Sequence, residues 1–476
     1  MRRLTAAALF ICLMQTAFSQ DANYWSSNYN AGGFFTPGAV IAYNRDSGVF
    51  FLNPALLGLS QKNATTISGT VYQYEHINIK NGTGRGKDLT SNSTNIIPQM
   101  VSGSISIKGK KPFTVGYALI NTPVINYQTS QRQDAKQNVL NDSYSPGPEA
   151  FIGQYTAQNT VTETSGILSA GVKVSDHWAF GFSMEAQLHK QNYNQQTIAR
   201  AIENTPAALP PVVSTDISYL VTYWNLGLRF KGGVSYDNEN HHFGLTVSSP
   251  LVHIGGSGTL VSDYVVSNLI NAYGDTVNFL ANGRQTGLKP NYKIPVSIAA
   301  AYAYDYGKGQ LYFSVEYFGH LNQYKIINPR NDYFLRPDTG NNNQITSDLL
   351  QLKDARKSVV NVGVGISFPI KPTVTGYCGA TTDFTYVDES LYKNSSGTVA
   401  NITDWNNYHL QLGANIKKRK FNFRAGLLAA YGSTGKYLQP VNFDNANEDN
   451  YLLGNPGNTK ASHFSMGLML AYIHNL

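Results

Sequence analysis

The sequence predicts an all-β protein, a 14-stranded antiparallel transmembrane β-barrel with an N-terminal plug (hatch) inside its lumen. Three observations indicate this fold. Apolar and polar residues alternate with a period of two along most of the chain after residue 64. Only 14% of the 476 residues are charged, whereas 43 are Gly and 31 are Tyr. The expected strands are joined by short and long connections in turn, as in outer-membrane barrels.

The first residues, 1–19, read as a signal peptide. Arg2 and Arg3 precede the apolar stretch 4–14, and small residues before position 20 suit cleavage after Ser19. The apolar stretch is about half the roughly 20 residues that a spanning helix needs. The mature chain then keeps a single cysteine, Cys378, so we expect no internal disulfide and stabilisation by packing and hydrogen bonds.

The alternating segments have unusual polar faces. In 178–190, large apolar residues fall on one face, while Gly, Ser, Glu, Gln and His fall on the other. The segments 310–324 and 408–416 repeat this division. A soluble sandwich would carry many Lys and Glu residues on its polar faces, whereas these faces are rich in Gly, Ser, Asn and Gln. Such faces are typical of a polar barrel lumen, with the apolar faces turned to lipid.

The expected strands are even in number, and a closed barrel has no unpaired sheet edge in hydrocarbon. They cover residues 65–80, 99–108, 112–128, 165–175, 177–192, 217–234, 241–254, 290–306, 309–325, 357–370, 371–386, 404–418, 419–434 and 460–474. One stretch, 261–280, could instead form an amphipathic helix.

Tight turns are expected between alternate strand pairs, and both chain ends then lie on the periplasmic side. The long links on the other side are expected at 81–98, 129–164, 193–216, 255–289, 326–356, 387–403 and 435–459. Aromatic residues near strand ends would form the interfacial girdles. The candidates are Trp178, Tyr292, Tyr304, Tyr306, Trp405 and Tyr472.

Residues 20–62 lack strand alternation and are apolar and rich in Gly, so we expect them inside the lumen as a plug, with the barrel at 63–476. Within this segment, Asp46 and Gly48 are followed by Asn53-Pro54-Ala55-Leu56. That pattern resembles the plug motif of the FadL/TodX family of outer-membrane transporters for long-chain fatty acids and other hydrophobic compounds. Pro54 fixes φ and Asn53 before it favours extended geometry, so the motif should form a rigid corner.

The resemblance implies passive uptake of a hydrophobic compound, most of all a long-chain fatty acid, in the outer membrane of a Gram-negative bacterium. The compound would be captured at the extracellular loops, bound in the lumen and released sideways through the wall. It also implies contact with outer-membrane lipid and lipopolysaccharide. We expect a monomer.

The candidate lateral gate is Pro123 in the third strand, because proline cannot donate to the ladder; a bulge near the rim is the alternative. An arginine facing the lumen could bind a fatty-acid carboxylate, and apolar plug residues could line an acyl pocket. The alternative for the arginines is pairing with other lumenal charges, and the alternative for the apolar residues is packing of the plug against the wall. The candidate lining residues are Phe34, Phe35, Phe50, Phe51, Leu57, Arg229 and Arg424.

Other function classes find little support. The formal charge of +7 is too mild to predict a nucleic-acid partner. The sequence has neither a Gly-x-Ser-x-Gly nor a His-Glu-x-x-His motif, and its ten histidines are scattered, so we expect no enzyme, no cofactor and no metal site. Two alternatives to transport stay open: a barrel that serves a protein secretion system, and an outer-membrane lipid hydrolase.

Overall fold

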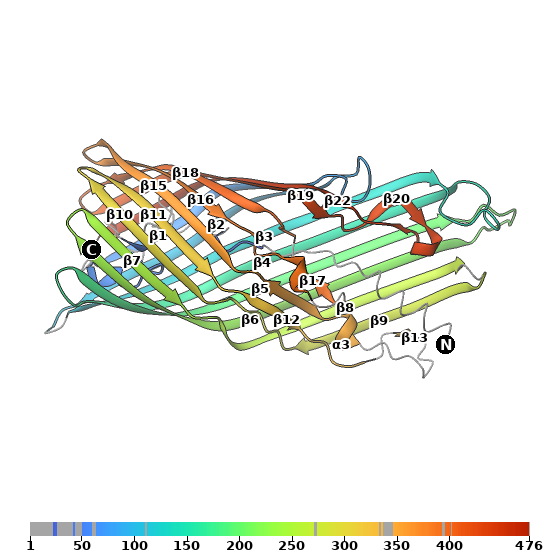
Figure 1. Cartoon of the computed structure of the whole chain (residues 1–476), viewed down its shortest axis with the longest axis horizontal. Helices are drawn as coiled ribbons and strands as arrows, with labels where there is room; N and C mark the ends of the chain where they lie inside the picture. The colour runs from blue at the N-terminus through green and yellow to red at the C-terminus, as the bar shows by residue number, and fades with distance from the viewer. Residues whose placement is uncertain are drawn as a thin grey trace.

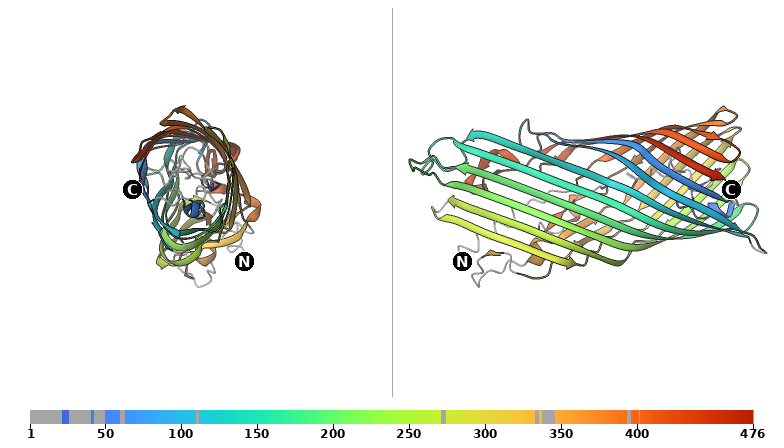
Figure 2. Two further views of the ribbon diagram at one scale, coloured as in Figure 1. Left: turned by 90° about the vertical axis from the view of Figure 1, so that its left-hand side faces the viewer. Right: turned by 180° about the vertical axis from the view of Figure 1, so that it is seen from behind.

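The computed structural model describes residues 22–25, 41–42, 50–59, 63–109, 112–270, 274–332, 335–336, 346–392, 396–400 and 402–475. They form a closed ring of fourteen antiparallel strands, as the sequence predicts. The first strand, β1 (Ala64–Ile79), pairs along its length with the last, β22 (Asn458–Asn475), which closes the ring. Viewed along its axis, the ring surrounds the short helix α2 (Leu56–Leu59) (Figure 2).

Ten further wall strands are single pieces. They are β2 (Leu89–Ile107), β3 (Phe113–Gln137), β4 (Glu149–Lys173), β5 (Trp178–Ile202), β6 (Val212–Asn238), β11 (Gly309–Phe318), β15 (Val359–Lys371), β16 (Val374–Asp383), β18 (Asn406–Lys417) and β19 (Phe421–Leu438).

The seventh and eighth wall strands are each divided in two. β6 pairs with both β7 (His241–Ser248) and β8 (Val252–Ile270), so these two segments together form one wall strand. β7 in turn pairs with β10 (Ser297–Tyr306), and β8 pairs with β9 (Thr276–Leu288). β8 and β9 cover 261–270 and 276–280 of the stretch that could have been a helix, so the helical alternative is wrong. The buried residues of this stretch, such as Ser262, Tyr264 and Val266, follow a period of two and face the lumen.

The wall is much taller on one side than on the other (Figure 1). β3, β4, β5 and β6 have 25, 25, 25 and 27 residues, whereas β10, β11 and β16 have 10 each. The expected long links 81–98, 129–164, 193–216 and 255–289 are therefore largely strand. Above the membrane the outer faces of these strands are largely polar and their inner faces pack in a core cluster, so the pattern of lipid-facing apolar residues ends there.

The outer face of the ring carries a belt of exposed apolar side chains, as a transmembrane barrel requires. On β5, for example, Trp178, Phe180, Phe182 and Met184 are 46%, 44%, 55% and 38% exposed. No helix among the described residues is long and apolar enough to cross a membrane.

The expected aromatic girdle is partly wrong. Trp178, Tyr306 and Tyr472 are outward and exposed, and Tyr304 is half-buried. Tyr292 and Trp405 are instead buried inside the ring, at 7% and 1% exposure. Both residues lie in segments that leave the wall and fold inward, which residue type alone does not show.

Short elements fold into the tall side of the lumen. A three-stranded sheet joins β12 (Leu321–Ile327), β14 (Leu352–Arg356) and β17 (Thr398–Val399). The other short elements are the hairpin β20 (Asn442–Asn447) and β21 (Leu453–Gly454), α3 (Thr346–Leu349) and the 3-10 turns η2 (Glu389–Leu391) and η3 (Glu448–Asn450). β13 (Leu335–Arg336) instead extends the wall sheet by pairing with β9. A large core cluster joins these elements to the inner faces of the long strands, so the tall half is packed and is not an open pore.

The plug packs directly against wall glycines. A Cβ atom on Gly171 of β4 would lie 2.6 Å from Pro54 O, and one on Gly181 of β5 would lie 2.2 Å from Pro54 C. Gly171 and Gly181 are register partners, so together they form a flat seat for the start of the helical turn. Phe50 and Leu57 fill the neighbouring space in a separate buried cluster.

We expect Gly171→Val to disturb plug docking, because the added side chain must overlap backbone atoms that cannot rotate away. Overpacking of this kind costs about 1–3 kcal/mol. Limited proteolysis of the folded barrel should cut the plug faster in this variant. The control is Gly166→Val on the same strand, where a Cβ meets nothing within 4 Å. Equal cleavage rates in both variants would contradict the seat.

Candidate functional site

A cavity of about 190 Å³ lies in the middle of the lumen, between the plug and the packed tall half. The plug, β3, β4, β5, β6, the inward segment 289–296, β11, β14 and the loop after β16 all contribute to it. The lining residues are Asn23, Tyr24, Phe51, Leu52, Ile120, Thr122, Val124, Glu163, Ser165, Ile167, Glu185, Gln187, Arg229, Lys231, Tyr292, Ile294, Phe318, Arg356 and Tyr386.

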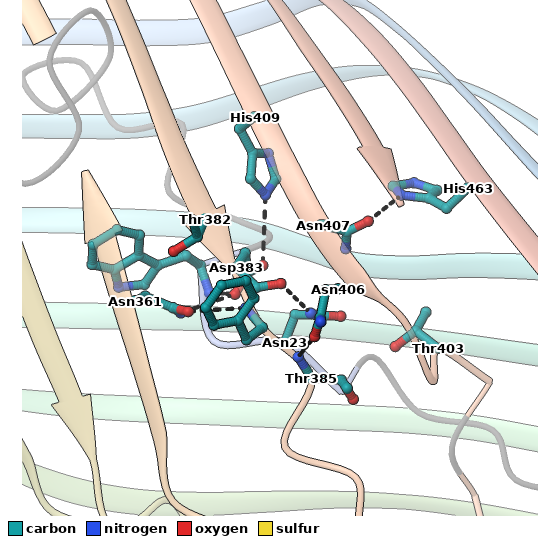
Figure 3. Close-up of polar contacts among 12 residues, drawn as sticks. Asn23, Asn361, Thr382, Asp383, Thr385, Thr403, Asn406, Asn407, His409 and His463 are labelled. Atoms are coloured by element: carbon teal, nitrogen blue, oxygen red, sulfur yellow. Dashed lines mark hydrogen bonds and ion pairs between the residues drawn. The ribbon is translucent and has the colours of Figure 1, made fainter. Parts of the chain in front are cut away.

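One side of the cavity is closed by residues 22–25, here called the N-terminal strap. Asp383 holds the strap, because its Oδ1 accepts from Trp25 N at 2.9 Å and its backbone O accepts from Asn23 Nδ2 at 2.7 Å. Asn361 Nδ2 and His409 Nε2 approach the same carboxylate at 3.2 and 3.6 Å (Figure 3). All of these wall residues are buried, so the strap is fixed by a charged group that water does not reach.

The strap makes two further contacts with the wall. Trp25 Nε1 donates to Glu316 Oε2 at 2.8 Å, and Tyr24 stacks on Phe318 with ring centroids 4.0 Å apart. Burial raises the pKa of the Tyr24 hydroxyl to about 12, although the nearby Arg356 guanidinium acts in the opposite direction. Tyr24 therefore presents a neutral phenol to the cavity.

The rigid corner expected at Asn53 and Pro54 has three hydrogen bonds from one side chain. Asn53 Nδ2 donates to Ile41 O at 2.6 Å and to Val234 O of β6 at 3.2 Å, and its Oδ1 accepts from Ala55 N at 3.0 Å. Asn53 is fully buried. It thus ties together two parts of the plug and the wall.

Arg356, one of the cations that line the cavity, is 1% exposed. Its Nε donates to Asp354 Oδ2 at 2.9 Å, and Asp354 Oδ2 also accepts from Tyr324. The guanidinium carbon lies 4.4 Å from the ring centroid of Tyr386 and 5.2 Å from that of Tyr292. Arg356 therefore stays in a cage of one carboxylate and aromatic faces, an arrangement that stabilises a desolvated cation.

The opposite wall carries a second polar group. Glu163 of β4 accepts from Gln187 Nε2 at 2.7 Å and lies 3.0 Å from His189 Nδ1. The His189 ring stacks on Tyr292 with centroids 3.7 Å apart, and Tyr223 Oη lies 3.2 Å from its Nε2. These contacts fix the Glu163 carboxylate at the cavity wall.

Two more cations face the cavity from β6. Arg229 donates from Nε to Ser249 O at 3.1 Å and from Nη2 to Ser297 Oγ at 2.9 Å. Lys231 Nζ donates to Phe51 O at 2.8 Å, which links the wall to the plug. With Arg356, the lining holds three cations against the two carboxylates Glu163 and Glu185.

The other predicted site residues are placed as follows. Phe51 lines the cavity, whereas Phe50, Leu56 and Leu57 pack between plug and wall. Ala55 is fully buried in the plug, and Arg424 is buried on β19 but does not line the cavity. Four residues lie outside the described part of the chain: Phe34, Phe35, Asp46 and Gly48.

Pro123 lies where the wall ladder is interrupted. β2 and β3 pair only from Met100–Ile120 down to Ile107–Phe113. Above that point β2 stays with β1 and β3 stays with β4, and the β3–β4 register shifts between Pro123 and Ile125. Ile120, Thr122 and Val124 line the cavity along this same stretch of β3. The cavity therefore borders the interruption of the β2–β3 ladder.

A second cavity, of about 130 Å³, lies nearer the tall rim. It is lined by aromatic and aliphatic groups such as Tyr219, Tyr264, Tyr451 and Leu350, together with short polar side chains. Within the described residues, no group of three His, Cys, Asp or Glu side chains could hold a metal ion.

Sequence patterns did not single out Arg356, Tyr24 or Glu163. Arg356 lies on a five-residue strand inside the lumen, where wall parity does not apply. Glu163 lies in a stretch that was expected to be a loop. The alternation of Thr and Ser with buried residues along β4 is the one signal that could have revealed it.

Comparisons with known proteins agree with the fold. No family model and no characterised protein matches the sequence. Among solved structures, the chain resembles a FadL homologue of Pseudomonas aeruginosa (TM-score 0.56, 11% identity, 94% of this chain and 98% of that chain covered). It also resembles the Pseudomonas putida toluene transporter TodX (0.56, 10%, 97% and 100%). The Ralstonia pickettii toluene transporter TbuX is similar as well (0.53, 12%, 94% and 97%). The chain thus has the fold of these proteins.

We expect Asp383→Ala to loosen the N-terminal strap, because Trp25 N and Asn361 Nδ2 lose a buried carboxylate acceptor. The bond from Asn23 Nδ2 to the backbone O of residue 383 remains. Hydrogen bonds to charged groups contribute about 1.5–3 kcal/mol each. A fluorophore coupled to a cysteine at Ala22, in a Cys378→Ala background, should show greater rotational freedom. Asp388→Ala is the control, since that half-buried carboxylate bonds the nearby Ser390 and no described residue of the strap. Unchanged anisotropy in the Asp383 variant would contradict the anchoring role.

Proposed function

We propose that this chain is an outer-membrane transport protein of a Gram-negative bacterium for the passive uptake of hydrophobic compounds. The observation that carries the proposal is the central cavity, which is enclosed by plug and strap and borders the interrupted β2–β3 ladder. A plugged lumen offers no wide water channel, so a cargo must be bound and passed on.

The proposed route begins at the apolar cavity near the rim. A hydrophobic compound would gain free energy there by burial against Tyr219, Tyr264 and Leu350. It would then move to the central cavity and leave beside Pro123, directly above the outward apolar residues Val101 and Leu119. Exit at this level leads into the membrane rather than into the periplasm. The names of the similar transporters support cargo of this class.

The charges of the central cavity favour an anionic amphiphile, and a long-chain fatty acid is the cargo that we propose. The lining carries three cations against two carboxylates, and a neutral hydrocarbon would add nothing to balance this excess of positive charge. A carboxylate can instead accept hydrogen bonds from Arg356 or Arg229, and guanidinium groups suit carboxylates.

The function is tested by uptake of labelled oleate and labelled toluene into cells that lack their own transporter and express this chain. We expect oleate uptake well above that of empty cells. A chain that assembles in the outer membrane but imports neither compound would refute transport and favour a role in secretion.

The exit is tested with Pro123→Val, which restores a backbone donor at the interruption. We expect slower oleate uptake at unchanged barrel yield. Pro369→Val is the matched control, because Pro369 also sits at a register shift but on β15, near a tight turn. Unchanged uptake in the Pro123 variant would refute this exit.

The ligand class is tested by binding to the purified protein. Arg356→Met should weaken binding of oleate by about tenfold relative to oleyl alcohol, since one charge-assisted hydrogen bond is lost. Arg356→Lys keeps the charge and should retain part of the preference. If a folded Arg356→Met barrel still prefers oleate by the original factor, the carboxylate lies elsewhere.

A further inference from the structure

The wall has a second interruption, between the seventh and eighth strands. The β7–β10 ladder ends at Ser248–Ser297, and the β8–β9 ladder begins again at Gly258–Leu288. Between these pairs lie residues 249–257 on one side and 289–296 on the other. In this fully described stretch, a single backbone hydrogen bond joins the two sides, from Leu251 N to Ile294 O at 3.1 Å.

The burial pattern here also departs from that of a continuous wall. In a continuous wall, exposed and buried residues alternate, yet Val252, His253 and Ile254 are all exposed in succession. Segment 289–296 instead turns inward, where Asn291 N donates to Ile326 O of β12. Unpaired backbone groups are costly in hydrocarbon, so an interruption of the ladder within the membrane indicates a functional role.

The interruption is at membrane depth and borders the central cavity. Val252 and Ile254 are 54% and 55% exposed on the outer face, like the other residues of the apolar belt. On the inner face, Tyr292 and Ile294 line the cavity. Only the inward segment therefore separates the cavity from the surrounding lipid at this point.

One side chain holds both edges together. Asn225 of β6 is fully buried, and its Oδ1 lies 2.7 Å from His253 Nδ1 and accepts from Tyr292 N at 3.3 Å. Its Nδ2 has no hydrogen-bond partner in the described part of the chain. A side-chain latch of this kind replaces a ladder of backbone bonds, and it is weaker than the roughly four bonds that a continuous ladder would supply over this length.

We propose that this interruption is a second lateral port, through which hydrophobic compounds pass between the central cavity and the bilayer when segment 289–296 moves away from β8. Asn225 is the latch that keeps the port closed. The inference rests on the proposed function for its cargo, but the opening itself can be tested without transport.

Opening is measured by cysteine labelling in phospholipid vesicles, in a Cys378→Ala background. Ile294→Cys reports on the inner edge of the port. Ala301→Cys is the closed control, since Ala301 is equally buried but lies in the paired part of β10, and Ile298→Cys on the outer face is the open control. An N-alkyl maleimide dissolved in the bilayer should label Ile294→Cys about 100-fold faster than Ala301→Cys, as local opening predicts.

Two results would overturn the port. One is labelling of Ile294→Cys as slow as that of Ala301→Cys. The other is equally fast labelling by a charged, water-soluble maleimide, which would mean access through the lumen. Asn225→Ala should raise the rate at Ile294→Cys about tenfold because the latch is lost. Asn192→Ala, which removes an outward hydrogen bond with Thr222 on the same wall, should leave the rate unchanged.

Passage of cargo is measured with a disulfide across the port, Leu251→Cys with Ile294→Cys. Oxidation should lower oleate uptake at least about threefold, and a reductant should restore it. The control disulfide, Thr246→Cys with Ala299→Cys, joins register partners in the intact part of the same strand pair. Unchanged uptake through the oxidised port in an otherwise active chain would overturn its role. If the chain imports no compound at all, the proposed function fails, and the labelling rates still decide whether the port opens.

Discussion

The structure depends on one constraint, which is that backbone N–H and C=O groups in hydrocarbon need partners within the protein. Closure of β1 against β22 satisfies this constraint around almost the whole ring. The two places where the ladder stops are therefore the most informative parts of the wall. Both border the same central cavity, one at Ile120 to Val124 and the other at Tyr292 and Ile294.

Buried polar groups in the lumen also have partners within the protein. Asp383, Asn53 and Arg356 are all buried, and each holds a different piece of the interior: the strap, the plug corner and the inner sheet. Buried polar groups of this kind are costly unless they are bonded. Their contacts connect parts of the chain that are far apart in sequence, so they specify one arrangement of the plug within a ring that could otherwise hold several.

The sequence was sufficient for the fold class, the strand number and the lipid-facing residues, since period-two alternation directly reflects one apolar face. It was insufficient above the membrane, where the outer face of strands such as the upper half of β4 is largely polar and the apolar residues face inward to the core cluster. It also could not place Tyr292 and Trp405, because a tyrosine or tryptophan near a strand end suits an interface and a core equally well. Arg356 was missed because its strand is not part of the wall.

The order of strands around the ring has a consequence for assembly. α2 packs against β3, β4 and β5, which are among the first five strands of the chain. The strap instead binds Asp383 and Thr403 on late segments. The helical turn can therefore dock on an open sheet of early strands, before β22 closes the ring. The strap can take its place only once β16 and β18 have arrived. The plug is thus enclosed by a wall that grows around it, and it need never be threaded through a finished barrel.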